Sequence, residues 1–327
     1  MQEITSHMIL EESLPIIDNF LSNQNEALNI RPLSATVLFE KYFIVGIEDE
    51  NKDHSYDFYD SPLFSAFLNY ITEWYRKRYG DAFEKNKLRL NGLVFIHNHP
   101  FEIQFPYSMT IDEGDEETIS LIMLSEFRAE EDWKEYIVSN PNLDLLDTST
   151  LRIIEREVMD AVELSRHILH NFCFVDTDSN ELKAMAVSIP SHINNAVFHV
   201  VSASCLEFNF ALWEFHLALE KSLKILVMQN IGSFPQSHDL VKLFSLTEFS
   251  SNTTLNNLIS SFPNHKRVIN LRYSESDFQD IHEIREIYLN ALKILYDVSN
   301  LIKKKFTMHE ATIYIKRLKH SGCKLVD

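Results

Sequence analysis

The sequence is poor in cysteine and glycine, and both shortages exclude whole classes of protein. Its three cysteines, Cys173, Cys205 and Cys323, are far apart and odd in number. They do not form a disulfide framework and they fit a reducing compartment. None of the six glycines stands in a GxGxxG or GxxxxGK pattern, which leaves neither a Rossmann fingerprint nor a P-loop. We therefore expect no chemistry built on a glycine-rich phosphate loop.

Long apolar runs and a basic N-terminus are missing as well. No run of about 18 apolar residues occurs, so we expect no transmembrane helix. The opening stretch MQEITSHMILEESLP lacks the basic and apolar regions of a signal peptide. We therefore expect a cytoplasmic protein with no membrane partner.

Positive charge is also scarce. The chain has 30 lysines and arginines against 48 acidic residues, a net charge of −18, which disfavours broad non-specific binding to nucleic acid. The exception is the stretch 301–327, which holds seven basic and two acidic residues. We expect this basic segment to fold back on the acidic body. Contact with an anionic partner such as RNA is the alternative.

The chain does have length and apolar content. With 327 residues, 45% of them hydrophobic, it can form two domains with cores of their own. In the first part, residues 35–48 look β-rich, and residues 61–80 predict a helix capped by Ser61 and ended by Gly80. Residues 90–105 predict a hairpin that turns near 98–100. Residues 117–127 predict a further strand, with a helix as the alternative.

Beyond residue 150 the apolar spacing is helical. Residues 151–168, 182–200, 206–230 and 275–305 each place apolar side chains three or four positions apart. Pro190 should kink or split the second of these helices. In the third, Glu220 and Lys224 form a favourable i,i+4 pair, and Gly232 and Pro235 should end it. Ser237 is then positioned to cap the next helix, with Asp239 in its first turn.

These elements predict a mixed fold: an N-terminal α+β domain followed by an all-α, up-and-down helical bundle. We place the α+β domain at residues 1–145, the bundle at 146–305 and a basic C-terminal segment at 306–327. In that segment Thr307 and Glu310 have the spacing of a capping box. The box predicts a short helix with Ala311, Tyr314 and Leu318 on one side.

Two stretches carry a resemblance to a known family. ALEKSLKIL, followed after a Gly/Pro break by HDLVKLF, and the later LRYSESDFQDIHEIREIYLNALKILYDV resemble the HEPN family (higher eukaryotes and prokaryotes nucleotide-binding domain). The resemblance spans residues 180–305 or so. It implies a helical bundle that commonly forms a homodimer. One branch of the family consists of ribonucleases, and the other consists of nucleotide-binding modules, scaffolds and helical partners of nucleotidyltransferases.

The ribonuclease signature of that family, an arginine followed after four to six residues by a histidine, is absent. None of the twelve arginines has a histidine at that distance, and the nearest pair, Arg166 and His170, is one residue too close. Arg285, in the last long helix, has no histidine after it. We therefore expect no catalytic residues of this type, and no cofactor.

The resemblance instead implies a ligand site on the bundle. Its candidate residues are Lys221, Lys224, His238, Asp239, Arg272 and Tyr273. A binding site would present lysines and a helix N-terminus to a phosphate. The simpler interpretation is a solvated lysine face and a capped helix start. His97, His99 and Glu102 could ligate a metal, but hairpin-turn histidines are ordinary polar residues, and we expect no metal site.

The sequence thus predicts a HEPN-domain protein that binds a nucleotide, an RNA end or a partner protein such as a nucleotidyltransferase. One alternative is a divergent HEPN ribonuclease of a toxin–antitoxin or anti-phage defence system. Another is a dimeric scaffold without a ligand.

Overall fold

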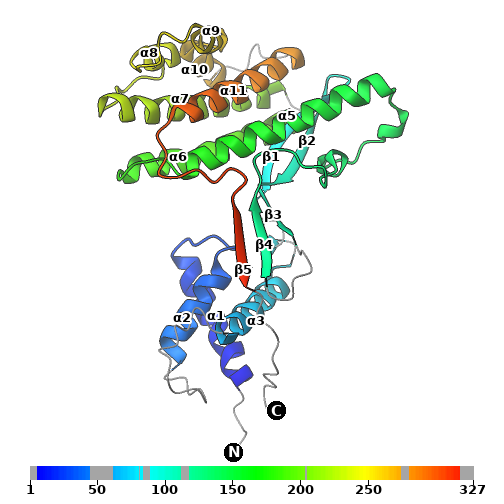
Figure 1. Cartoon of the computed structure of the whole chain (residues 1–327), viewed down its shortest axis with the longest axis vertical. Coiled ribbons are helices and arrows are strands. Elements are labelled where there is room, and N and C mark those ends of the chain that lie inside the picture. The colour runs from blue at the N-terminus through cyan, green and yellow to red at the C-terminus, as the bar shows by residue number, and fades with distance from the viewer. Residues whose placement is uncertain are drawn as a thin grey trace, which may run out of the picture. The chain divides into compact units, whose positions relative to one another are not determined.

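In the computed structural model the chain divides into two compact units (Figure 1). The structure describes residues 6–44, 62–80, 82–83, 89–111, 118–202, 205–273 and 280–316. Unit 1 comprises Met1–Leu88, Gly114–Thr118 and Lys316–Asp327, and unit 2 comprises Arg89–Glu113 and Ile119–Ile315. These limits differ from the expected division at residue 145, because the hairpin after residue 88 packs with the long helices.

Unit 1 is built on helices. They are α1 (Ser6–Asn23), α2 (Arg31–Phe43) and α3 (Pro62–Tyr79). The expected β-structure over 35–48 is wrong in its described part, because α2 runs through Phe43. Pro32 starts this helix, and Ala35 and Phe39 reach the core at helical spacing, so packing overrides the local β propensity. The predicted helix 61–80 is confirmed as α3, and Gly80 follows it with a φ of 50°.

Unit 2 begins with two small antiparallel sheets. The first is the hairpin of β1 (Arg89–Ile96) and β2 (His99–Pro106), and the second has the order β3 (Ser108–Ile111), β4 (Thr118–Met123), β5 (Thr312–Lys316). The hairpin and the strand at 117–127 are therefore confirmed. The two-residue turn at His97 and Asn98 has φ angles of 48° and 61°, as a tight hairpin turn requires.

The helix predicted after Thr307 is wrong, because β5 occupies that place. The Glu310 carboxylate accepts hydrogen bonds from the Ser125 and Glu126 amides at 2.7 and 3.1 Å instead of capping a helix at Thr307. The Met123 amide then donates to the Ala311 carbonyl at 2.9 Å, which brings β5 to the edge of β4. The β-branched run in TIYIK suits this pairing.

Helices make up the rest of unit 2. They are α5 (Thr148–Cys173), α6 (Asn180–Val201), α7 (Cys205–Ile231), α8 (Leu240–Ser245), α9 (Thr253–Ser261), α10 (His265–Tyr273) and α11 (Ile281–Leu301), with the 3-10 turns η2 (Trp133–Tyr136) and η3 (Leu143–Leu145). The expected fold class, an α+β part followed by a helical bundle, is confirmed. Pro190 does not split α6, which runs through it. No helix of the described residues is long and apolar enough to cross a membrane.

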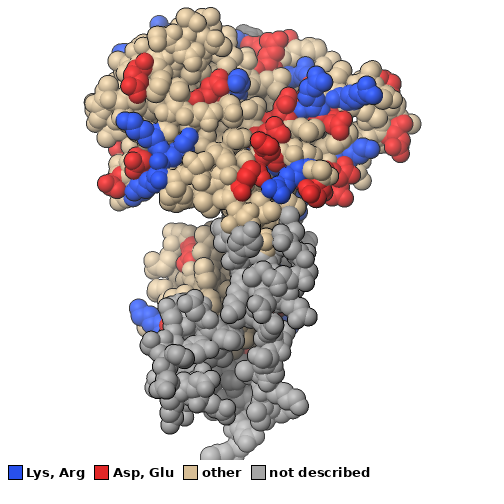
Figure 2. Space-filling view, in the orientation of Figure 1, with Lys and Arg blue, Asp and Glu red and all other residues tan. Residues whose placement is uncertain are grey.

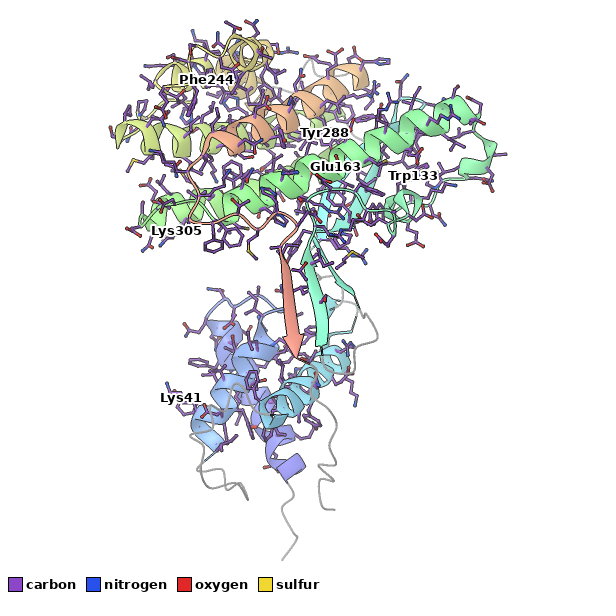
Figure 3. The ribbon with its side chains drawn as sticks, viewed as in Figure 1. Lys41, Trp133, Glu163, Phe244, Tyr288 and Lys305 are labelled. Atoms are coloured by element: carbon purple, nitrogen blue, oxygen red, sulfur yellow. The ribbon has the colours of Figure 1, made fainter. Side chains whose placement is uncertain are left out.

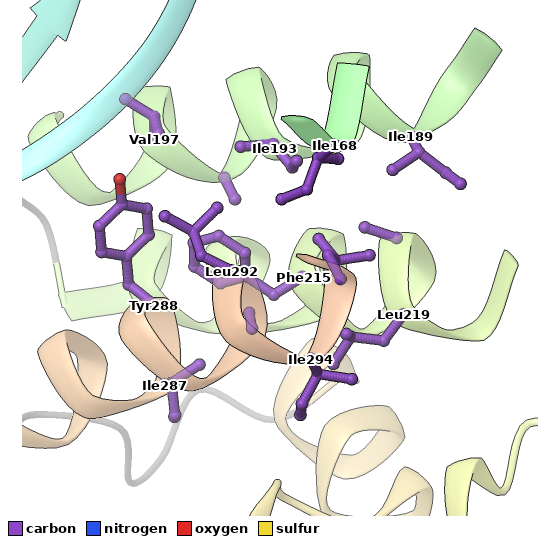
Figure 4. Close-up of a cluster of buried hydrophobic side chains, with 14 of the residues drawn as sticks. Ile168, Ile189, Ile193, Val197, Phe215, Leu219, Ile287, Tyr288, Leu292 and Ile294 are labelled. Carbon is purple, nitrogen blue, oxygen red and sulfur yellow. The ribbon is translucent and has the colours of Figure 1, made fainter. Parts of the chain in front are cut away.

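Helix α7 is the centre of this bundle. Its predicted stripe from Phe208 to Leu226 is buried, and so are Ala211, Ala218 and Ile225 on other sides of the helix. Figure 4 shows side chains of α6, α7 and α11 meeting in this core. The hairpin joins it through Tyr288, whose hydroxyl accepts a hydrogen bond from the Leu93 amide at 2.9 Å. A side chain at Gly92 would lie 3.0 Å from that hydroxyl, so glycine permits the contact.

Candidate functional site

Polar side chains interrupt the buried surface of α7 at two places, and both include predicted site residues. At the first, the Glu220 carboxylate accepts from the Lys224 ammonium at 2.6 Å and from the His238 ring Nδ1 at 2.9 Å. The Glu220 side chain is only 6% exposed, whereas that of His238 is 58% exposed. Although burial opposes it, the hydrogen bonds from Lys224 and His238 bring the pKa of Glu220 below its usual value.

His216, one turn before Glu220, holds the same segment from inside. Its ring Nε2 donates to the His238 carbonyl at 2.9 Å, because a carbonyl oxygen can only accept. Its Nδ1 is buried and has no hydrogen-bond partner within the residues that the structure describes. Burial lowers the pKa of His216, so the ring stays neutral. The loop between α7 and α8 is therefore fixed at both the side chain and the backbone of His238.

The second place lies between α6 and α7. The Lys221 ammonium donates to Ser188 Oγ at 2.8 Å and to His192 Nε2 at 2.7 Å, and His192 Nδ1 lies 2.6 Å from Glu214 Oε2. An ammonium group only donates, so His192 Nε2 must be the acceptor and Nδ1 carries the proton given to Glu214. Burial lowers the pKa of Lys221. We call these four side chains the α6–α7 polar network.

Asp239 is the N-cap of α8, and Ser237 is not. The Asp239 carboxylate accepts from the Lys242 amide at 3.0 Å, while Ser237 Oγ accepts from the Asp239 amide at 3.2 Å. The sequence placed the cap two residues too early, because either residue type can fill that position. The cap occupies one of the amides that a phosphate at this helix start would need, that of Lys242, which agrees with the simpler interpretation of Asp239.

The structure brings two of the six predicted site residues together, since Lys224 and His238 both bond to Glu220, whereas Lys221 bonds to α6. Lys221 and Lys224 share one side of α7, and His238 and Asp239 follow at the start of α8. Arg272 and Tyr273 lie in α10, but their side chains are outside the described residues. Both lysines already donate to neighbouring side chains. The simpler interpretation was a solvated lysine face, and the structure differs there too, because both lysines are partly buried.

A second feature of α6 and α7 was not found from the sequence. Val187, Phe198 and Phe210 are 69%, 64% and 43% exposed. Val187 and Phe198 are eleven residues apart on one helix, which puts them on the same side. The His199 ring lies 5.6 Å from that of Phe198 and 5.5 Å from that of Phe210, so it connects the two helices. We call Val187, Phe198 and Phe210 the α6–α7 apolar face.

Comparison with protein families decides what this bundle is. The model of the HEPN domain matches residues 197–305, which run from the end of α6 through α11. This part of the chain is a HEPN domain. No curated protein and no solved structure matches the chain. The suspected resemblance over residues 180–305 is thereby confirmed.

The two arginines considered for a nuclease role are engaged inside the protein. Arg166 lies in α5, before the HEPN domain, and its side chain is 0% exposed. It donates to the Glu131 carboxylate and to the Pro106 and Glu126 carbonyls. In α11 of the HEPN domain, Arg285 pairs with Glu157. Arg166 is therefore a structural anchor for the loop after β4.

The remaining candidate sites are the hairpin-turn histidines and two hollows on the surface of unit 2. His97 and His99 are exposed at the hairpin turn. Within the described residues, no group of three or more His, Cys, Asp or Glu side chains is arranged to hold a metal ion. Two shallow hollows of about 440 and 420 Å³ lie on unit 2, one beside β2 and η2 and one along α5. Neither is lined by a predicted site residue.

Charge on unit 2 is mixed rather than concentrated. Figure 2 shows basic and acidic side chains interspersed on the face that it draws. The segment after α11 folds back, as expected for its described part. The Asp176 amide donates to the Lys303 carbonyl at 2.9 Å, and the Lys305 ammonium lies 3.5 Å from Asp178. Figure 3 labels Lys305 on this segment. Residues 317–327 lie outside the described part of the chain.

Proposed function

We propose that this protein is a non-nucleolytic HEPN-domain binding module that pairs with a second copy of itself through the α6–α7 apolar face. The observation that carries the proposal is the exposure of Val187, Phe198 and Phe210 on two adjoining helices. Large apolar side chains that gather on one face of a folded domain mark interaction sites. A two-fold dimer uses the same patch on both copies, so a single face of this kind is sufficient.

The α6–α7 polar network also supports pairing through the α6–α7 apolar face. Ser188, Lys221, His192 and Glu214 bond to one another across the two helices that carry the apolar side chains. Burying charged groups in an interface is costly unless they are paired. Because this network pairs them internally, docking over it would leave no charge without a partner. It also gives Lys221 a structural role that does not require a phosphate.

The first test is the mass of interface variants in solution. We expect Phe198→Asp to dissociate the dimer, because the carboxylate would have to be buried without a partner. Ile153→Asp is the matched control, since Ile153 is also a large exposed apolar residue, 58% exposed, but lies on α5. Equal masses for both variants would remove the α6–α7 apolar face as the interface. The alternative partner at this face is a nucleotidyltransferase-type protein. Its binding would be measured by titrating it into the unmodified protein.

The second candidate function is binding of a nucleotide or RNA end at Lys221, Lys224, His238, Asp239, Arg272 and Tyr273. It is favoured by His238, whose Nδ1 bonds to buried Glu220 while most of the ring is exposed. This arrangement orients Nε2 toward solvent, where a terminal phosphate could bind. Thermal-shift titration with ATP and with 5′-phosphorylated RNA tests this candidate. A shift that is lost in His238→Ala supports it, and no shift leaves a ligand-free dimeric scaffold.

The competing enzyme is a divergent HEPN ribonuclease of a toxin–antitoxin or anti-phage system. Such cleavage needs a cation and a proton-transfer group together on the scissile phosphate. Arg166 is buried beside His170, and Arg285 is paired with Glu157. We therefore expect intact RNA after incubation of the purified protein with structured and single-stranded RNA without metal. Cleavage that persists in Arg166→Ala and Arg285→Ala would identify a different active site.

A further inference from the structure

Three histidines that the proposed function does not use lie together where α5 meets the segment before β5. His167 and His170 are on α5, and His309 is on that segment. The ring centroid of His309 lies 4.4 Å from that of His167 and 5.6 Å from that of His170. Imidazoles change charge near neutral pH. Their close packing is therefore favourable only while the rings are neutral.

Asn171 fixes the protonation state of His309. The amide nitrogen of Asn171 donates to Ser299 Oγ at 2.9 Å and to Asn300 Oδ1 at 3.1 Å. Its oxygen is therefore the atom that faces His309 Nε2, at 3.0 Å, and Nε2 must carry the proton. The other ring nitrogen, Nδ1, is buried and has no hydrogen-bond partner in the described part of the chain. A second proton on His309 would thus be a buried charge without an acceptor.

His170 is the most enclosed of the three. It is 3% exposed, and neither of its ring nitrogens has a hydrogen-bond partner among the described residues. Burial, followed by the nearby His309 and His167, lowers the pKa of His170 from 6.5 to about 4. Burial also lowers the pKa values of His167 and His309. All three rings are accordingly neutral at physiological pH.

The charged groups around the cluster do not offer it an acceptor. They are Glu163 and Arg166 on α5, Glu126 and Arg128 after β4, Lys304 after α11 and Glu310 beside His309. Glu310 is committed to Arg128 and to the Ser125 and Glu126 amides, and Glu163 accepts from the Phe127 amide. Among the described residues, no carboxylate bonds to any of the three imidazoles.

We propose that His167, His170 and His309 form a pH-sensitive latch, which holds residues 308–316 against α5 at neutral pH and releases them on acidification. Release exposes the rings to water, where each can take a proton. Because residues 312–316 form β5, opening of the latch also frees the edge of β4. The proposal is independent of the α6–α7 apolar face and of any ligand on α7.

The size of the effect follows from His170. Its pKa is about 4 in the closed state and returns to 6.5 when the ring is solvated. Between about pH 7.5 and about pH 5 the released form gains a proton that the closed form does not take up. The ratio of released to closed molecules therefore rises roughly 25-fold through His170 alone. Glu310 remains ionised over this range, since its pKa is lowered to about 2, so titration of Glu310 does not contribute to the pH response.

Amide hydrogen exchange of the full chain tests the latch. We compare about pH 7.5 with about pH 5, after correction for the intrinsic pH dependence of exchange. Exchange in residues 308–316 should rise roughly 25-fold, and exchange in the β1–β2 hairpin should not change. Equal protection of residues 308–316 at both pH values would overturn the proposal. So would a uniform loss of protection over unit 2, which would indicate global unfolding.

Two variants assign the response. His170→Leu removes the titrating ring and keeps an apolar side chain, so the pH response of residues 308–316 should largely vanish. If that variant does not fold, His170→Phe removes the titrating ring and keeps an aromatic side chain. His282→Gln, at an exposed histidine on α11, should respond as the unmodified protein does. A full response in either His170 variant that folds would overturn the latch, as would protection by Zn²⁺ that His309→Gln abolishes.

Discussion

Two regions of unit 2 use histidines to hold a segment against a long helix, and they do so with opposite electrostatics. At α7, His238 bonds to the buried Glu220 carboxylate, with Lys224 on its second oxygen. At α5, His309 and His170 face other imidazoles, and among the described residues no carboxylate bonds to either ring. Glu220 therefore holds His238 through a charged acceptor, whereas the His170 ring has no hydrogen-bond acceptor among the described residues. A buried ring without an acceptor loses its contact in acid, because a second proton on it would be a charge without a partner.

Among the variants that test this difference, substitution of Glu220 should lower the unfolding free energy most. In Glu220→Gln the Lys224 ammonium loses its counter-charge in a site where Lys224 is 13% exposed. Removing one partner of a buried ion pair costs about 3 kcal/mol or more in unfolding free energy. Urea denaturation at neutral pH measures the loss.

The control for Glu220 is an exposed pair of the same spacing. Lys293 and Asp297 are also four residues apart on a helix, but they are 51% and 26% exposed. Asp297→Asn should cost no more than about 0.5 kcal/mol. Similar losses in Glu220→Gln and Asp297→Asn would mean that burial of Glu220 has no energetic consequence.

His170→Leu should change the pH dependence of stability next most strongly. The folded pKa of His170 is depressed to about 4, so its neutral form stabilises the fold fully above 6.5. That stability declines as the pH falls from 6.5 toward 4. Between pH 7 and 5 the unmodified protein should lose about 2 kcal/mol more than His170→Leu. Parallel stability curves for the two proteins would contradict this assignment.

Glu310→Gln should have a smaller effect with a different pH window. The hydrogen bonds of Arg128, Ser125 and Glu126 outweigh burial and lower the pKa of Glu310 to about 2. Its contribution is therefore present above the ordinary carboxyl pKa near 4.5 and is lost as the pH falls toward 2. The side chain is 34% exposed, so solvent screening reduces the expected loss at neutral pH to about 1 kcal/mol. Equal stability of Glu310→Gln and the unmodified protein at pH 7 would refute the anchor.

Asp239 should give the smallest effect. As the N-cap of α8 it accepts from the Lys242 amide, so Asp239→Ala should cost about 1 kcal/mol and Asp239→Asn almost nothing. Thermal denaturation of both variants distinguishes a cap from a ligand residue. If Asp239→Asn lost nucleotide binding with unchanged stability, Asp239 would be a ligand residue instead.

The sequence predicted the elements of unit 2 better than their polar contacts. The stripe of α7 and the i,i+4 pair of Glu220 and Lys224 depend on spacing within one helix, which a sequence contains. The bond between Glu220 and His238 also needs the path of the loop after Gly232. The α6–α7 polar network needs the register of one helix against another. Neither is encoded in local spacing.

The wrong predictions have a common physical cause. α2 was expected as a strand because its residues have β propensity, and the segment after Thr307 was expected as a helix because a capping box fits there. In the fold, Ala35 and Phe39 pack as a helix face, and Glu310 bonds to the loop after β4. Tertiary contacts outweighed a local signal worth about 1 kcal/mol in each case. The apolar face was missed because an exposed phenylalanine looks like a core residue in a sequence.

The most direct test of the proposed function is the molar mass of the unmodified protein, measured by sedimentation equilibrium over the micromolar range. One chain has a mass of 38.2 kDa. Pairing through Val187, Phe198 and Phe210 predicts twice that mass, a return to 38.2 kDa for Phe198→Asp and no change for Ile153→Asp. A mass of 38.2 kDa for the unmodified protein at every concentration would contradict the account.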